Sequence, residues 1–319
     1  MACPINNLVM VTELSVIIPV RDEASNIPVL TERLKNALNT LQLSFEIIFI
    51  TDMNRDDTVS ILKMQYQSDQ RVKYIKLSRS FGQHVAVFAG LQASSGQYAV
   101  IMDGDLQDEP EDIPVLYNQI RKGFDIVYGI KKTKNESAIR NVISRFFLHT
   151  ISRLSDVHMD FNTSMFRIIS RRTINEVLKY REIEPSLTFI MGSLNLPTDK
   201  VLVSSGKRFS GKTNYPLSRQ MRFALTSLLS FSTKPIEYVS MLGLIISVIS
   251  FIYFIIVIIQ RLSSGIAVLG WPTIIALITF LGGMQLFAIG IIGQYIGKIF
   301  LQTKNRPMYT VEEQTGFSS

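Results

Sequence analysis

Residues 14–130 alternate between short apolar runs and longer segments with helical periodicity. The apolar runs have the length of buried strands and cover Leu14–Val20, Phe45–Thr51, Val72–Leu77, Tyr98–Met102 and Asp125–Ile130. Between them, apolar residues recur with the period of an α-helix near Ile27–Leu41, Thr58–Gln67, His84–Ser94 and Glu111–Lys122. This alternation predicts βαβ units and an α/β fold with a doubly wound, mostly parallel sheet. A further helix is expected around Ser137–Leu154, followed by mixed strands and helices over Phe161–Val203.

Toward the C-terminus the pattern becomes apolar on all sides. No charged residue occurs between Glu237 and Arg261, or between Arg261 and Lys298. Each gap exceeds the roughly 20 residues that a helix needs to cross a bilayer. We therefore expect two membrane-spanning helices, Ile236–Ile259 and Ala267–Gly297. A buried hairpin of a soluble core is the weaker alternative, because an amphipathic core helix is apolar on one face only.

Charges around these segments predict the orientation of the chain. The N-terminus lacks a basic and apolar signal segment, so the globular part is expected to stay in the cytosol. Lys298, Lys304 and Arg306 follow the second span, whereas Arg261 alone lies between the spans. This distribution agrees with the positive-inside rule. We expect a multi-pass protein of the inner (plasma) membrane, with the globular domain and the tail on the cytosolic side.

The segment before the first span carries a helical apolar pattern with basic residues on its other side. Within Leu217–Ser232, Arg219 and Arg222 interrupt the apolar positions, which is typical of a helix lying in the membrane interface. An ordinary amphipathic helix of the globular domain is the alternative. The formal net charge of +7 concentrates near the spans and favours anionic lipid and phosphate partners over nucleic acid. We divide the chain into a globular domain (1–212), juxtamembrane helices (213–235), a transmembrane region (236–297) and a tail (298–319).

An acidic motif, Asp103-Gly104-Asp105-Leu106-Gln107-Asp108, follows the fourth expected strand. In open α/β sheets, ligands bind at the carboxyl ends of the strands. Neighbouring carboxylates repel one another unless a cation lies between them, and such oxygen ligands suit Mg²⁺ or Mn²⁺ bound to substrate phosphates. An acidic turn that caps the next helix is the simpler alternative.

Polar residues also follow the first three expected strands. They lie in Pro19–Glu23, Thr51–Thr58 and Ser78–His84. Because the carboxyl ends of parallel strands meet at one edge of a sheet, we expect these loops and the acidic motif to form one polar crevice.

Residues Gly206–Thr213 have the spacing of a P-loop, but Pro216 stands where the following helix should begin. We interpret the segment as a basic loop that binds a diphosphate through Lys207, Arg208 and Lys212.

These motifs together resemble those of the polyprenyl-phosphate (bactoprenol- and dolichol-phosphate) glycosyltransferases of glycosyltransferase family 2. The resemblance covers nearly the whole chain. The matching residues are Val16-Ile17-Ile18-Pro19 with Glu23, Asp52 with Asp56 and Thr58, Asp103–Asp108, Arg208–Tyr215, and Gly293–Lys298 through Arg306-Pro307.

The chain departs from the family pattern at three places. Met53-Asn54 stands where the family usually has Gly-Ser, and Gln294 where it often has Glu. The segment Asp160–Arg167 replaces the common Asp-x-Gly-Asp-Phe-Arg, so that Asn162 or Asp160 is the nearest candidate for the acid of that motif.

The resemblance implies a GT-A-like fold and inverting transfer of a hexose from a nucleotide-sugar to a polyprenyl (undecaprenyl) phosphate, for cell-surface glycan modification. Glucose and UDP are the favoured sugar and nucleotide. The resemblance places the nucleotide-sugar on Pro19, Glu23, Asp52 and Asp103, the divalent metal on Asp105 helped by Gln107, and catalysis on Asp103 and Asp105. The basic residues before the first span, Arg219 among them, lie where a lipid phosphate would arrive.

The acceptor chemistry is consistent with the absence of an obvious general base. The second pKa of a phosphate monoester is near 6, so the acceptor is largely dianionic at cytosolic pH. A processive polysaccharide synthase is an alternative, but that class usually carries Gln-x-x-Arg-Trp, and the single tryptophan here, Trp271, lies in the apolar region. A non-catalytic membrane scaffold that kept the fold is the other alternative. A homo-oligomer is compatible with the sequence.

Overall fold

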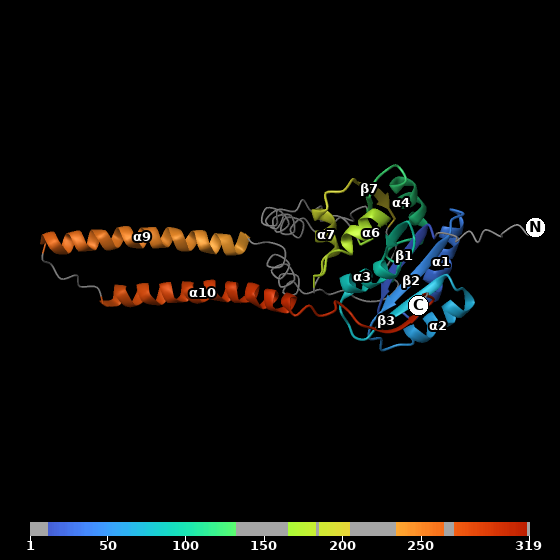
Figure 1. Ribbon diagram of the computed structural model, residues 1–319, viewed down its shortest axis with the longest axis horizontal. Helices are drawn as coiled ribbons and strands as arrows, with labels where there is room; N and C mark the ends of the chain where they lie inside the picture. Colours follow the sequence, from blue (N-terminus) through green and yellow to red (C-terminus); the bar gives the residue numbers. More distant parts are fainter. Residues whose placement is uncertain (1–11, 132–164, 183–184, 205–233, 265–270, 318–319) are drawn as a thin grey trace, which may run out of the picture. The chain divides into compact units, whose positions relative to one another are not determined.

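The computed structural model describes residues 12–131, 165–182, 185–204, 234–264 and 271–317. They form two compact units, which are considered one at a time. The first unit contains an α/β sheet together with the C-terminal segment from Arg306 onward, and the second contains two long helices (Figure 1).

The first unit is built around one eight-stranded sheet with the order β7-β5-β6-β4-β1-β2-β3-β8. Its strands are β1 (Leu14–Val20), β2 (Phe45–Thr51), β3 (Val72–Leu77), β4 (Tyr98–Ile101), β5 (Ile126–Lys131), β6 (Arg167–Ser170), β7 (Thr198–Val203) and β8 (Val311–Thr315). Among these strands, β6 and β8 run antiparallel to their neighbours and the other pairs are parallel. The predicted mostly parallel sheet is confirmed.

Helices alternate with the strands of this sheet along the chain, and those between β1 and β5 connect parallel strands as the sequence pattern predicts. They are α1 (Ile27–Asn39), α2 (Thr58–Ser68), α3 (Gln83–Ala93), the short 3₁₀ helix η1 (Pro110–Asp112), α4 (Ile113–Ile120), α6 (Arg171–Val177) and α7 (Leu187–Ser193). The expected bounds of β1, β2 and β3 are confirmed at both ends, β4 ends one residue earlier, and β5 is shifted by one. The helix expected over Glu111–Lys122 begins as η1, and α4 has Pro114 in its first turn.

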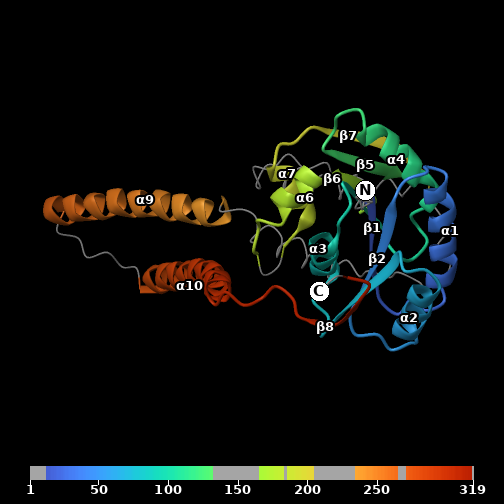
Figure 2. The same ribbon diagram turned by 45° about the vertical axis from the view of Figure 1, so that its right-hand side comes forward.

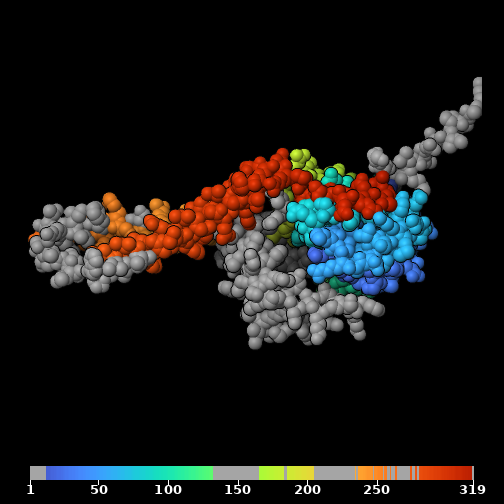
Figure 3. Space-filling view, turned by 90° about the horizontal axis from the view of Figure 1, so that it is seen from below, coloured from blue at the N-terminus to red at the C-terminus, as the bar shows by residue number. Residues whose placement is uncertain are grey.

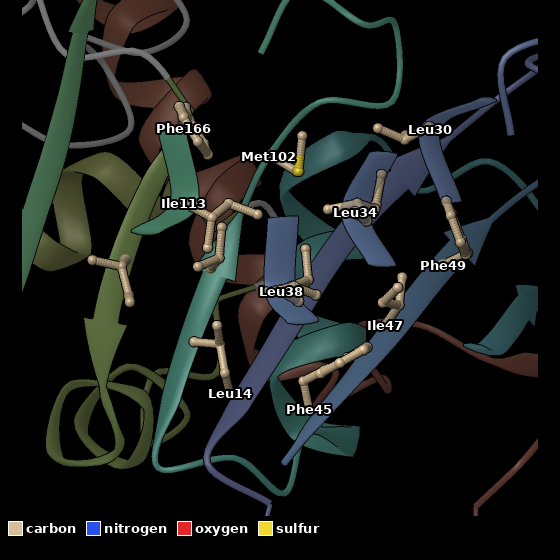
Figure 4. Close-up of a cluster of buried hydrophobic side chains, with 14 of the residues drawn as sticks. Leu14, Leu30, Leu34, Leu38, Phe45, Ile47, Phe49, Met102, Ile113 and Phe166 are labelled. Carbon is tan, nitrogen blue, oxygen red and sulfur yellow. The ribbon is translucent and has the colours of Figure 1, made fainter. Parts of the chain in front are cut away.

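Two apolar clusters hold the sheet between its helices. Figure 2 shows α1 and α2 on one side of the sheet and α3 and α6 on the other. Every residue of β2 is buried, as in a parallel strand covered on both faces. The cluster under α1, α2 and α4 is drawn in Figure 4, which labels Leu14, Leu30, Leu34, Leu38, Phe45, Ile47, Phe49, Met102, Ile113 and Phe166.

Strand β8 lies in the segment 298–319, to which the sequence analysis assigned no strand. It pairs with β3 at the edge of the sheet. The sequence Val-Glu-Glu-Gln-Thr lacks the apolar alternation of a half-buried strand. Instead, charged and polar partners on β3 stabilise it: Lys76 Nζ lies 2.6 Å from Glu312 Oε1, and the Tyr74 hydroxyl donates to Glu313 Oε1 at 2.6 Å. The apolar and polar pattern of one segment cannot reveal cross-strand pairs of this kind, because the partner residues lie in another segment.

The second unit contains α9 (Lys234–Ser264) and α10 (Trp271–Thr303). Both are long and apolar enough to cross a bilayer: mean hydropathy is 1.9 over Ile236–Tyr253 and 1.4 over Phe280–Thr303. Helix α10 continues six residues past the end predicted at Gly297.

Several expected features lie outside the described residues. They are the helix at Ser137–Leu154, the basic loop Gly206–Thr213 and the interfacial helix Leu217–Ser232.

Candidate active site

The loops at the carboxyl ends of the parallel strands contact one another. Arg21, which follows β1, places its Nε 3.7 Å from Asp52 Oδ1 after β2, and its Nη1 donates to Ser80 Oγ after β3 at 3.2 Å. Gln83, the first residue of α3, donates a hydrogen bond to Asp103 Oδ1 after β4. The four loops that the sequence analysis grouped therefore meet at one edge of the sheet.

The acidic loop after β4 has a backbone that its sequence makes possible. A Cβ at Gly104 would lie 2.6 Å from Cγ1 of Val20, so glycine allows the loop to approach β1 closely. Leu106 has a φ of 61°, a left-handed conformation that is uncommon for a bulky residue and costs about 1–3 kcal/mol. Strain of this kind persists where surrounding contacts impose it, and the loop has such contacts.

The carboxylates of the acidic motif have different hydrogen-bond partners. Asp108 is 2% exposed; its Oδ2 accepts from the backbone N–H of Asp103 at 3.0 Å, and its Oδ1 lies 2.7 Å from Lys131 Nζ at the end of β5. Asp105 accepts from the backbone N–H and the side-chain amide of Gln107, at 3.1 and 2.8 Å. Asp108 therefore braces the loop from the inside.

Asp103 carries the clearest electrostatic signature of this edge. Burial raises the pKa of Asp103 to about 6, and the neighbouring charges of Asp108 and Asp105 add to the effect. Lys131 and the hydrogen bond from Gln83 act in the opposite direction and lower the pKa only in part. Carboxylates that repel one another in this way are stabilised by a bound cation.

A buried cation, Arg167, lies on the strand next to β4. It opens β6, pairs in register with Ile101, and its guanidinium lies 5.0 Å from the ring centre of Tyr128. Burial lowers the pKa of Arg167, whereas Tyr128, Asp103 and Asp108 raise it. Arg167 thus supplies positive charge near the acidic loop.

The loop after β1 is folded onto the loop after β2. Asp22 has a φ of 55°; its N–H donates to Asn54 Oδ1 at 3.1 Å, and its carboxylate accepts from the N–H of Arg55 at 2.6 Å. Asp56 accepts from the N–H groups of Ala24 and Thr58 at 3.0 and 3.1 Å. Asn54, one of the departures from the family pattern, is therefore part of this contact.

Among the candidate donor-binding residues, Asp52 has a buried carboxylate oxygen that faces Arg21. Its Oδ1 lies 3.7 Å from Arg21 Nε and accepts no hydrogen bond from the residues that the structure describes. Glu23 has its backbone N–H bonded to Thr58 Oγ1 at 3.1 Å, and its carboxylate accepts from the amide of Asn26. Pro19, near the end of β1, is opposite Ile50 of β2. The structure thus brings Pro19, Glu23, Asp52, Asp103, Asp105 and Gln107 to one edge of the sheet.

Other predicted residues lie outside the described part of the chain, namely Lys207, Arg208, Lys212, Arg219, Asp160 and Asn162. Sequence reasoning included Gln83 only as part of the loop Ser78–His84 and Arg167 only as the end of the segment Asp160–Arg167, and it did not single out Lys131. Arg167 left a signal, because it is a charged residue directly before the buried pair Ile168 and Ile169.

The donor set suits a hard divalent cation in its chemistry. The carboxylates of Asp103 and Asp105 and the amide oxygen of Gln107 are oxygen ligands of the kind that Mg²⁺ and Mn²⁺ prefer. Within the residues that the structure describes, no group of three or more His, Cys, Asp or Glu side chains is placed to hold a metal ion. The remaining ligands of a bound cation would then come from substrate phosphates and water.

Comparison with known proteins agrees with this geometry. Residues 15–178 match the model of Glycosyl transferase family 2. An uncharacterized glycosyltransferase of Synechocystis sp. is 33% identical over 96% of this chain and 97% of its own. The bactoprenol glucosyl transferase of Shigella phage SfV is 31% identical over 95% of this chain and 99% of its own.

Solved structures show the same fold. Glucosyl-3-phosphoglycerate synthase from Mycobacterium tuberculosis, in complex with Mg²⁺ and UDP, has a TM-score of 0.50 and 17% identity, covering 69% of this chain and 79% of that one. The expected GT-A-like fold is confirmed. The chain belongs to glycosyl transferase family 2, and bactoprenol glucosyl transferases are among its relatives over nearly the full length.

Proposed function

We propose that this transferase moves a hexose, with glucose favoured, from a nucleotide-sugar to a polyprenyl phosphate at the membrane surface. The observation that carries the proposal is the meeting of four polar loops at the carboxyl edge of a family 2 sheet, with Asp103 and Asp105 on the loop after β4. The names of the bactoprenol glucosyl transferases support glucose and a polyprenyl acceptor.

The donor nucleotide is assigned to the loops after β1 and β2. The buried Oδ1 of Asp52 lies 3.7 Å from Arg21 Nε, accepts no hydrogen bond from the described part of the chain, and suits an N–H group of a base. Uracil offers such a group, which favours UDP. Pro19 and Glu23 line the same edge, and Asp103 lies next to it through Arg21, Ser80 and Gln83.

Asp105 and Gln107 would hold Mg²⁺ or Mn²⁺, with Asp103 adjacent. When bound, the cation neutralises charge on the departing nucleoside diphosphate. The position of the cation would be set by residues of this chain. Asp108 and Lys131 brace the loop, and Gln107 orients the Asp105 carboxylate.

The acceptor phosphate attacks without a general base, because it is already largely dianionic at neutral pH. Direct displacement inverts the anomeric carbon. Lys207, Arg208, Lys212 and Arg219 supply the positive charge that brings the two anionic substrates together. Helices α9 and α10 would anchor the protein in the membrane, and the basic residues after α10 favour a cytosolic sheet. We propose the division into a glycosyltransferase domain (1–212), juxtamembrane helices (213–235), spans (236–297) and tail (298–319), with β8 of the tail completing the sheet of the glycosyltransferase domain.

The test is sugar transfer by membranes that contain the full chain. Membranes receive radiolabelled UDP-glucose and undecaprenyl phosphate, and the lipid extract is analysed by mass spectrometry. We expect one hexose per lipid, loss of the product with a chelator, and loss in Asp105→Asn. Glu111→Gln is a matched control, because the Glu111 carboxylate is paired with Arg33 of α1. A polymeric product would support a polysaccharide synthase, and no transfer from any of a panel of nucleotide-sugars would support a scaffold.

A further inference from the structure

The C-terminal segment Met308–Phe317, here named the tail strand segment, is seated on the sheet along its whole length. Strand β8 pairs with β3, and Met308, Tyr309 and Phe317 pack against the apolar cluster that contains α3. Figure 3 shows the C-terminal end of the chain, in red, lying against the blue and cyan residues of the sheet unit. Gly316 has a φ of 92°, and a Cβ there would lie 2.7 Å from Lys73 Cγ. Such a close fit indicates one defined docked position.

The beginning of the tail strand segment contacts the loop between β3 and α3. The N–H of Ser78 donates to the carbonyl of Thr310 at 2.9 Å, and the hydroxyls of the same two residues are hydrogen-bonded. The hydroxyl of Tyr309 donates to Gln92 Oε1 near the end of α3 at 2.7 Å. The tail strand segment therefore holds both the start of this loop and the helix that follows it.

The same loop carries two contacts of the candidate active site. Ser80 accepts from Arg21, which also faces Asp52, and Gln83 donates to Asp103. Gly82, directly before α3, has a φ of 89° and nothing within 4 Å of the position of a Cβ. A glycine in open space gives the loop a flexible joint, so its conformation depends on what holds its two ends.

We propose that Tyr309 and Thr310 are positioning residues of the donor site: by holding Ser78 and α3, they fix the loop that places Ser80 and Gln83 against Arg21 and Asp103. The expected change in KM rests on the proposed function. The expected ordering of the loop by Tyr309 and Thr310 rests on the geometry alone. Seven residues separate the end of α10 from the start of β8. The strand beside these two residues is therefore also the first strand that follows the apolar helix along the chain.

The experiment compares the full-length double variant Tyr309→Phe/Thr310→Val with the wild type. The substitutions remove two hydroxyls with little change of shape. We expect the KM for the nucleotide-sugar to rise about threefold to tenfold, with kcat within about twofold. Amide hydrogen exchange of residues 78–83 should become about tenfold faster, while that of β1 stays unchanged.

Two further variants separate positioning from general stability. Thr310→Ser keeps the hydroxyl and should retain the wild-type KM. Glu312→Gln loses the ion pair with Lys76 in the same strand pair, contacts no residue of the loop, and should change neither KM nor exchange of residues 78–83. An equal rise of KM in Glu312→Gln would overturn the proposal.

The exchange measurement also keeps this inference separate from the proposed function. Unchanged exchange of residues 78–83 in the double variant overturns the positioning role, whatever the activity. Faster exchange with an unchanged KM overturns its link to the donor. If the wild type transfers no sugar, the proposed function fails, and calorimetric UDP binding in Mg²⁺ replaces KM as the second measure. The double variant should then bind UDP about threefold to tenfold more weakly, and unchanged affinity overturns the link.

Discussion

Replacing Asp103 by asparagine should stabilise the folded protein while removing its activity. Burial and the charges of Asp108 and Asp105 make the ionised form of Asp103 unfavourable, which is why its pKa rises from 3.8 to about 6. Asparagine has nearly the same shape, accepts the hydrogen bond from Gln83 through its amide oxygen, and carries no charge. The negative charge of Asp103 lowers the stability of the folded protein, and the same charge is needed for activity.

The size of the effect follows from the two pKa values. Each pKa unit corresponds to about 1.36 kcal/mol, so at pH 7 the charge costs the folded state up to about 3 kcal/mol. Relaxation of the loop reduces this figure, and we expect a gain of about 1–3 kcal/mol in Asp103→Asn. For a domain of this size the melting temperature should rise by about 2–12 °C.

The sign of the pH dependence is fixed as well. A carboxyl whose folded pKa is raised costs nothing below its unfolded pKa, costs more as the pH rises toward 6, and has a constant cost above that value. Calorimetric melting of the detergent-solubilised full chain, in chelator, should therefore show a larger gain at pH 7.5 than at pH 4.5. Glu111→Gln is the control of opposite sign, because the hydrogen bond from Arg33 lowers the pKa of Glu111. A lower melting temperature at pH 7.5, or equal gains at both pH values, would refute the reasoning.

Three further predictions test the braces around the site. Gly104→Ala should reduce sugar transfer at least about tenfold, because its Cβ would lie 2.6 Å from Val20 Cγ1 and displace the acidic loop; transfer at the wild-type rate would contradict the close approach. Lys131→Met should lower the free energy of unfolding by roughly 1–3 kcal/mol, since Asp108 is left buried without its cation, and denaturant titration measures the loss. Burial alone would raise the pKa of Glu46, but hydrogen bonds from Lys73, Ser15 and Ser95 outweigh it and hold the pKa below 4.5. Glu46→Gln should therefore cost stability at pH 7, and its difference from the wild type should shrink in melts recorded below pH 4.5, as the folded carboxylate protonates.

The helices and strands of the regular part of the fold could be predicted because each is indicated by the apolar pattern of its own segment. Strands β1, β2 and β3 are buried apolar runs, and their bounds agree with the structure at both ends. Strand β8 could not be found in this way. It is held by side chains of β3, Tyr74 and Lys76, which lie more than 200 residues away along the chain.

The candidate site was predictable to the extent that it lies in loops after strands. Asp103 and Asp105 stand out as neighbouring acids, and the shared edge follows from the parallel topology. The sequence did not show which of the three acids is buried, because the buried position of Asp108 depends on an ion pair with Lys131 from a different strand. The contact of Gln83 with Asp103 likewise depends on how the loop before α3 is held.

The central claim is that a divalent cation on the acidic loop joins this protein to a nucleoside diphosphate. The most direct test measures Mn²⁺ by electron paramagnetic resonance as UDP is added to the full chain and to Asp105→Asn. We expect UDP to increase Mn²⁺ binding to the wild type, and Asp105→Asn to lose that increase. Equal UDP-dependent Mn²⁺ binding in both proteins would contradict the claim.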